Sequence, residues 1–230
     1  MSQTIKIAAV VPAAGVGSRM QVGHPKQYLK IADKTILEHT LNKLGQLPEL
    51  DSIVVAVSET DEYFKTLPLQ DRRIIAVNGG KERADSVLNA LNALTSHQPD
   101  WVLVHDAARP LVTLQDMRTL ITQCMADGEG GLLAARVKDT IKRGETHSLE
   151  TVPREQLWQA LTPQFFPYQA LKDALQRALE NSVSITDEAS AMEWAQHPVK
   201  LICGRSDNIK ITTPEDYDLA CFLISKQESE

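Results

Sequence analysis

Short apolar runs alternate with segments of helical periodicity along most of this chain, and this alternation constrains the fold more than any other feature. The runs at residues 5–11, 53–57 and 101–104 are apolar and end at proline or at polar residues, as buried strands do. Residues 36–47 place apolar side chains at the intervals of one helical face. The pattern predicts βαβ units, and therefore an α/β, Rossmann-like fold with a mostly parallel sheet and helices on both faces.

The same alternation continues through the second half of the chain. Further strands are predicted at residues 73–77, 131–137 and 199–202, and helices at residues 82–94, 169–180 and 187–195. Additional helices are predicted to start at Ser58, Thr113 and Thr213, because each is followed three residues later by an aspartate that can complete the N-terminal cap.

Residues 138–153 interrupt this rhythm. The stretch is polar, rich in threonine and turned at Gly144, which predicts a protruding β-hairpin. Because a bare two-stranded hairpin is only marginally stable, we expect this arm to pack on a second copy of the chain and to form a homodimer. We predict a single domain, residues 1–230, that carries the arm.

Composition excludes several classes of protein. The net charge of −6 argues against broad electrostatic binding to nucleic acid. The three cysteines show neither a paired nor a zinc-ligand spacing, so a reducing compartment is expected. The first residues lack the features of a secretory signal, and no apolar run is long enough to span a membrane. We therefore expect a cytoplasmic protein that binds neither membrane nor nucleic acid.

The loop after the first strand predicts a phosphate site. Gly15 and Gly17 allow close approach of the backbone, whose N–H groups can form an anion-binding nest. Arg19 adds a forked cation, and Lys26 follows Pro25 with a point charge. A tight turn after a Rossmann-like strand is the alternative. Neither a P-loop nor a dinucleotide fingerprint fits, since S-R-M stands where each requires other residues.

Four further motifs with polar residues contribute candidate site residues. Gly80 and Ser86 in G-G-K-E-R-A-D-S can contact a flat base, while Asp106 and Arg109 in H-D-A-A-R-P can hold a cation, a hydroxyl or a phosphate. Lys210 lies in N-I-K-I-T, and T-D-E-A-S precedes a helix. Each motif also has a purely structural interpretation. These are a glycine turn for G-G-K-E-R-A-D-S, an ion pair for H-D-A-A-R-P, a solvent-facing lysine for N-I-K-I-T and a helix cap for T-D-E-A-S. The carboxyl ends of parallel strands meet at one edge, where ligands bind.

G-x-G-x-R-M followed by P-K-Q-Y resembles the nucleotide-binding motif of the sugar-phosphate nucleotidyltransferases. With H-D-A-A-R-P, T-D-E-A-S and N-I-K-I-T in the same order, nearly the whole chain is similar to the 2-C-methyl-D-erythritol 4-phosphate cytidylyltransferase family of the non-mevalonate isoprenoid pathway. The resemblance implies transfer of CMP from CTP to 2-C-methyl-D-erythritol 4-phosphate, with release of pyrophosphate and with Mg²⁺ as cofactor.

The resemblance also implies roles for individual residues. The catalytic set would be Arg19, Lys26, Arg154 and Lys210. The substrate-binding set would be Ala13, Ala14, Gly15, Gly80 and Ser86 for CTP, and Asp106, Arg109, Thr140, Thr162 and Thr186 for the acceptor. Thr140 and Arg154 would complete a site across the dimer. Asp106 would contribute to a magnesium site in which the CTP phosphates hold most of the metal's ligand positions. The role of Lys81 stays open.

Two other functions stay open. Ribitol 5-phosphate is an alternative acceptor, although its family often has H-D-A-V-R-P where this chain has H-D-A-A-R-P. A non-catalytic nucleotide sensor on the same fold is the second alternative. The combination of Arg19, Lys26, Asp106 and Lys210 favours an enzyme, because a sensor has no need of all four. A dinucleotide oxidoreductase lacks support, since Met20 replaces the third glycine of its fingerprint.

Overall fold

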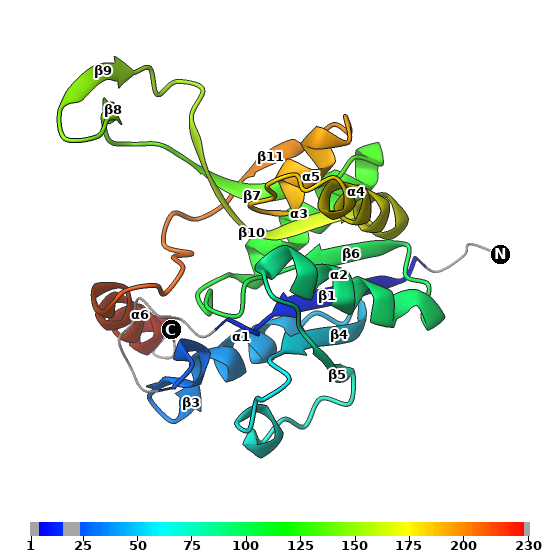
Figure 1. The fold of residues 1–230 in the computed structure, drawn as a ribbon. Coiled ribbons are helices and arrows are strands. Elements are labelled where there is room, and N and C mark those ends of the chain that lie inside the picture. The colour runs from blue at the N-terminus through cyan, green and yellow to red at the C-terminus, as the bar shows by residue number, and fades with distance from the viewer. Residues whose placement is uncertain (1–4, 16–23, 228–230) are drawn as a thin grey trace.

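The structure, a computed structural model, describes residues 5–15 and 24–227. A seven-stranded sheet runs through the molecule in the order β11-β7-β10-β6-β1-β4-β5 (Figure 1). Strand β10 is antiparallel to both of its neighbours, and the other pairs are parallel, which confirms the mostly parallel sheet. The strands are β1 (Ile7–Pro12), β4 (Leu50–Val57), β5 (Ile74–Asn78), β6 (Trp101–Val104), β7 (Gly131–Arg136), β10 (Trp158–Pro167) and β11 (Lys200–Cys203).

Helices cover both faces of this sheet, as predicted. The side chains of β1 alternate between two cores: Ile7, Ala9 and Val11 pack with one cluster, and Ala8 and Val10 with the other. The first cluster includes α1 and α3, and the second includes α2, α4 and α5. The helices are α1 (Ile36–Gly45), α2 (Arg83–Ala93), α3 (Leu114–Asp127), α4 (Tyr168–Glu180), α5 (Glu188–Trp194) and α6 (Pro214–Gln227). Among the described helices, none combines the length and apolar character needed to cross a membrane.

The short elements lie at the edges of this framework. They are the strands β2 (Lys30–Ile31) and β3 (Lys34–Thr35), which pair with each other, and the 3-10 turns η2 (Lys26–Tyr28), η3 (Phe64–Thr66) and η4 (Leu94–Ser96). Two predicted helix caps are present: Thr113 accepts the N–H of Asp116 at the start of α3, and Thr213 accepts that of Asp216 in the first turn of α6.

The helix predicted to start at Ser58 is wrong. Residues 58–73 contain only the single turn η3 between β4 and β5. Asp61 explains the difference, because one carboxylate oxygen accepts the N–H groups of Tyr63 and Phe64, and the other accepts the Tyr28 hydroxyl. The aspartate thus closes one turn, and Pro68 soon afterwards prevents its extension.

Strand β10 has no counterpart among the predicted strands, although it lies inside the sheet between β7 and β6. Pro163 and Pro167 argue against a central strand, because proline cannot donate to the ladder. The structure accommodates Pro163 where the register between β10 and β7 shifts, between Ala160 and Gln164. Buried Phe165 and Phe166 then point into opposite cores of the sheet.

Residues 141–152 form the antiparallel strands β8 (Ile141–Gly144) and β9 (Ser148–Val152), inside the range predicted for the hairpin. Gly144 has φ +155°, and a Cβ there would lie 2.0 Å from the carbonyl oxygen of His147. Figure 1 shows this hairpin standing away from the sheet. Nearly all of its side chains are exposed, and Leu149 is 80% exposed. Dimerisation through the hairpin stays a prediction.

Candidate active site

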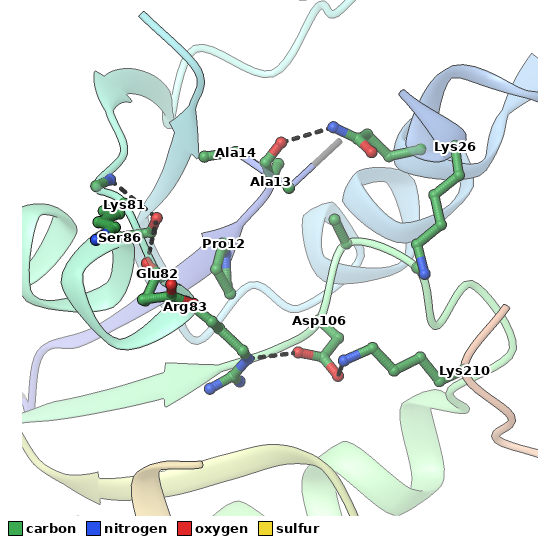
Figure 2. A pocket seen from close by; sticks show the side chains of 15 residues that line it. Pro12, Ala13, Ala14, Lys26, Lys81, Glu82, Arg83, Ser86, Asp106 and Lys210 are labelled. Carbon is green, nitrogen blue, oxygen red and sulfur yellow. Dashed lines mark hydrogen bonds and ion pairs between the residues drawn. The ribbon is translucent and has the colours of Figure 1, made fainter. Parts of the chain in front are cut away.

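The ends of β1, β5 and β6 meet at a cavity of about 280 Å³, as expected for an open α/β sheet (Figure 2). Residues from four separate motifs line it. Of the predicted site residues, those in the lining are Ala13, Ala14, Gly15, Lys26, Gly80, Ser86, Asp106 and Lys210. The fold therefore brings motifs that are distant in the sequence together at one cavity, and the roles predicted for these residues stay predictions.

One wall of the cavity is small and uncharged. The backbone N–H of Ala13 donates to the carbonyl of Ala56 on β4 at 2.7 Å, and the Gln27 side chain donates to the Ala13 carbonyl at 2.6 Å. Gly79 lies so close that an added Cβ would be 2.5 Å from the Ala14 Cβ. These contacts hold the two loops together, and the small residues Ala13, Ala14, Gly15 and Gly80 leave space on this side of the cavity for a flat group.

The Ser86 hydroxyl organises the neighbouring turn. It accepts the backbone N–H of Gly80 at 3.0 Å and donates its own proton to the carbonyl of Glu82 at 3.1 Å. From the sequence, Ser86 was predicted to hydrogen-bond directly to the edge of a base. In the structure its one donor is already used inside the protein, and only a lone pair is left for a ligand.

Lys26 reaches the opposite side of the cavity from a 3-10 turn. Pro25 holds the chain extended before η2, with φ −61° and ψ 130°. Figure 2 shows Lys26 across the cavity from Ala14 and Ser86. The Nζ atom of Lys26 donates to the carbonyl oxygen of Ile211 at 2.6 Å, so the first loop is tied to the N-I-K-I-T segment. Arg19 and Gly17, predicted to act with Lys26, lie outside the described residues.

Asp106 is the centre of the charged floor. Its Oδ1 is 3.0 Å from Arg83 Nε, and its Oδ2 is 2.9 Å from Lys210 Nζ and 3.4 Å from Arg109 Nε. Burial alone raises the pKa of the Asp106 carboxyl, but the positive charges of Arg83, Lys210 and Arg109 outweigh burial and hold this pKa far below its usual range. Asp106 is therefore ionised and paired at neutral pH.

Arg109 and Thr162 lie beneath this floor and do not line the cavity. Arg109 donates to the carbonyl of Asn208 at 2.7 Å, and the Asn208 amide donates to the carbonyl of Thr162 at 2.8 Å. Both residues are buried, at 9% and 3% exposure. The acceptor contacts expected of Arg109 and Thr162 stay a prediction, and in the structure both residues join three segments of chain under Asp106.

His105 lies in the same buried layer and is neutral. Its Nε2 faces the Arg109 carbonyl at 3.0 Å, which can only accept, so Nε2 carries the proton. Nδ1 then accepts from the Thr162 hydroxyl at 2.9 Å, while that hydroxyl accepts the Asp106 N–H. Burial lowers the pKa of His105 to about 4 against the partial opposition of the Asp106 charge. His105 is thus a structural residue.

Thr140, Arg154 and Thr186 are exposed and lie outside the cavity lining. Arg154 donates to the carbonyl of Lys138 at the base of the hairpin, and the Thr186 N–H donates to the Ser190 hydroxyl at 3.2 Å. The structure of the single chain does not bring Thr140, Arg154 or Thr186 into the cavity.

Arg83 and Glu188 were missed as site residues, although they lie within the motifs G-G-K-E-R-A-D-S and T-D-E-A-S. Arg83 lines the cavity and contacts Asp106 with Nε, while Nη1 and Nη2 contact the two oxygens of Glu188 at 2.6 and 3.0 Å. The sequence offered one clue to the pair: Arg83 and Glu188 carry opposite charges within two of the site motifs, and neither had an assigned role.

The described residues around Asp106 do not fit a protein-held magnesium site. Among the described residues, no group of three or more histidine, cysteine or acidic side chains is placed to hold a metal ion. Both Asp106 oxygens already contact cations, and a divalent ion would add charge to three positive groups. The direct magnesium contact expected of Asp106 is therefore not supported by the geometry.

Comparison with known proteins decides the family. The family model described as 2-C-methyl-D-erythritol 4-phosphate cytidylyltransferase matches residues 7–226. The chain belongs to this family. A 2-C-methyl-D-erythritol 4-phosphate cytidylyltransferase from Pseudoalteromonas translucida (strain TAC 125) is 65% identical over 230 residues, covering 100% of this chain and 95% of that protein.

Solved structures of the cytidylyltransferase family share the fold. The crystal structure of a 4-diphosphocytidyl-2C-methyl-D-erythritol synthase has a TM-score of 0.83 and 36% identity, and covers 96% of this chain and 99% of that chain. The Francisella tularensis 2-C-methyl-D-erythritol 4-phosphate cytidylyltransferase has a TM-score of 0.82 and 34% identity, covering 95% and 99%. The resemblance drawn from the motifs is confirmed.

The depressed pKa of His105 predicts a specific dependence of stability on pH. Below pH 6.5 the unfolded chain protonates this histidine, while the folded chain does so only near pH 4, so stability falls as pH drops through this window. Between pH 7 and pH 5 this contributes about 2 kcal/mol. Urea unfolding should show a correspondingly smaller pH dependence in His105→Gln than in the wild type. An equal dependence in both proteins would show that His105 is not held neutral.

Proposed function

We propose that this chain joins CMP from CTP to 2-C-methyl-D-erythritol 4-phosphate, with release of pyrophosphate, as a step in non-mevalonate isoprenoid precursor synthesis. One observation carries the proposal: a small, backbone-lined wall for a base faces Lys26 and Lys210 across a single cavity. That arrangement suits a ligand with a flat group at one end and several negative charges at the other. Both substrates are water-soluble phosphates, which supports the expected cytoplasmic location.

The reaction needs cations more than it needs a base. An oxygen of the acceptor's phosphate attacks the α-phosphorus of CTP, the bond from that phosphorus to the oxygen bridging to the β-phosphate breaks, and pyrophosphate leaves. A phosphate monoester has its second pKa at about 6 and is mostly a dianion at neutral pH, so the nucleophile is already deprotonated. Neutral, buried His105 is not required as a proton acceptor.

The barrier is the approach of two anions and the charge that develops around the α-phosphorus. Lys26 and Lys210 are the described cations best placed to offset this charge, and Arg19 is proposed to act with them. Lys210 is held by Asp106, and Lys26 by the Ile211 carbonyl. The two lysines are thus positioned before any substrate binds, which lowers the reorganisation needed during the reaction.

The base and ribose of CTP are proposed to bind the uncharged wall. Backbone groups of Ala13, Ala14 and Gly15 would contact the nucleoside from one side, and Gly80 from the other. The remaining lone pair of the Ser86 hydroxyl can accept from the exocyclic amino group of cytosine, a donor that uracil lacks. Exposed Lys81 also borders the cavity and keeps no assigned role.

Magnesium is proposed to enter with CTP and not on a protein carboxylate. Triphosphate oxygens are hard ligands that Mg²⁺ prefers, and Mg²⁺ in such sites is commonly held by substrate phosphates with few protein ligands. Bound in this way, the ion would neutralise part of the phosphate charge. Both Asp106 oxygens already pair with cations, which supports binding of the ion by the CTP phosphates and not by this carboxylate.

The acceptor site is proposed to be completed by a second subunit. Arg154 and Thr140 lie at the base of the hairpin β8–β9, outside the cavity of their own chain. The hairpin exposes almost all of its side chains, including Leu149, and a two-stranded hairpin gains little stability alone. Packing of the hairpin on a partner would bury Leu149 and bring Arg154 and Thr140 to the partner's acceptor side, near Thr186.

The proposed reaction is tested by pyrophosphate release from CTP and Mg²⁺ with each candidate acceptor in parallel. We expect release with 2-C-methyl-D-erythritol 4-phosphate and a much lower rate with ribitol 5-phosphate. Mass spectrometry should identify the cytidine diphosphate conjugate as the second product. Activity with ribitol 5-phosphate alone would overturn the assigned acceptor, and CTP binding without product from either acceptor would favour a sensor.

Substitution of Lys26 tests the proposed charge stabilisation. Lys26→Ala should lower kcat by roughly 100- to 1000-fold, as does the loss of one preorganised donor to a developing negative charge. The fold should survive, because Lys26 is only half-buried and lies in the short turn η2, not in the sheet or in one of its covering helices. Lys30→Ala, at an exposed lysine outside the cavity lining, is the control and should keep normal turnover. A near-normal kcat for Lys26→Ala would refute its role.

A charge on the hairpin tests the dimer. Leu149→Asp should shift the protein from dimer to monomer in sedimentation velocity, because an ionised side chain would be buried without a partner in the interface. Leu219→Asp provides the control, since Leu219 on α6 is also exposed, at 47%. A wild-type monomer, or a Leu149→Asp dimer as stable as the wild type, would count against the hairpin as the interface.

A further inference from the structure

Arg83 joins Asp106, which lines the cavity, to the buried Glu188, which does not. It is the first residue of α2, directly after the turn that contains Gly80, and its side chain is 26% exposed. Its Nε donates to Asp106, and its Nη1 and Nη2 donate to Glu188, the first residue of α5. Every donor atom of this planar group therefore contacts a carboxylate, in the fork geometry that only arginine offers.

Glu188 lies in the first turn of α5, and its carboxylate pairs with Arg83. It is 1% exposed, and both of its oxygens accept from Arg83. The cap of α5 is supplied by its neighbours instead, since Asp187 accepts the Ser190 N–H at 2.9 Å and the Ser190 hydroxyl lies 3.2 Å from the Asp187 N–H. A buried carboxylate at this position is costly unless it is paired, so its presence is explained by the arginine that it orients.

We propose that Glu188 and Arg83 are a positioning pair for the reaction: Glu188 fixes the Arg83 guanidinium, Arg83 fixes the Asp106 carboxylate, and Asp106 holds the Lys210 ammonium toward the cavity. The inference rests on the proposed cytidylyl transfer, because it assigns the pair to the placement of Lys210. Neither Arg83 nor Glu188 is a catalytic residue in this scheme. Figure 2 shows the line from Arg83 through Asp106 to Lys210.

The net charge of the cluster around Asp106 supports a role of Arg83 and Glu188 in the reaction over a purely structural role. Three cations, Arg83, Arg109 and Lys210, face two carboxylates, Asp106 and Glu188, so the cluster keeps one net positive charge beside a cavity proposed to bind phosphates. Burial lowers the pKa of Arg83, but the charges of Glu188 and Asp106 outweigh burial and raise it above its ordinary value. Arg83 therefore stays charged and paired with Asp106, which in turn holds the Lys210 ammonium at the cavity.

The decisive variant is Glu188→Gln, which keeps the shape of the side chain and removes its charge. We expect kcat to fall at least about tenfold while the KM for CTP changes less than about threefold, because the nucleoside wall does not include Glu188. In a protein that already carries Lys210→Ala, Glu188→Gln should lower kcat by a further factor of less than about three. The effects of two substitutions do not add when both act through the same group, here Lys210. Arg83→Lys, which keeps the charge and loses the fork, should resemble Glu188→Gln and serves if that variant does not fold.

Asp71→Asn supplies a matched control. Asp71 and Arg73 form the same kind of bidentate pair, at 2.6 Å, but neither residue lines the cavity. This variant should lose stability with unchanged kcat. If the wild type makes product and Glu188→Gln behaves like Asp71→Asn, or its effect multiplies with that of Lys210→Ala, the positioning pair is refuted. A wild type that makes no product would instead overturn the proposed function.

Discussion

The buried carboxylate of Asp106 is the constraint on which the site depends. A charge at this depth is strongly unfavourable unless cations and hydrogen bonds compensate for it. Compensation comes from Arg83, Arg109 and Lys210, which belong to three different segments of the chain. The floor of the cavity can therefore form only when α2, the loop after β6 and the segment before α6 have all reached their final positions.

The parallel sheet makes this convergence possible. Strands β1, β5 and β6 run in the same direction, so the loops that follow them open at the same edge. The antiparallel strand β10 adds Thr162 from the opposite direction, and its hydroxyl joins His105 to the Asp106 backbone. A neutral wall for a base and a cationic floor for phosphates thus come from ordinary sheet geometry combined with a few charged side chains.

The sequence predicted those features that depend on neighbouring residues. The caps at Thr113 and Thr213, the apolar run of β1 and the glycine turns are local, and the structure contains them. The helix expected after Ser58 failed because a distant residue, Tyr28, shares the aspartate that was expected to cap it. Strand β10 was missed because its prolines are tolerated only at a register shift that depends on β7. The pairing of Arg83 with Glu188 joins residues 105 positions apart, which no local pattern encodes.

The ionisation state of Asp106 is the most direct test of this organisation. Carbon-13 NMR of the labelled side-chain carboxyl can follow its titration from pH 7 toward the acid limit of the folded protein. The three surrounding cations predict that Asp106 stays ionised throughout, with a pKa far below that of an ordinary aspartate, and that Lys210→Ala raises this pKa. A titration at or above the ordinary value of 3.8 would contradict the central place given to this carboxylate.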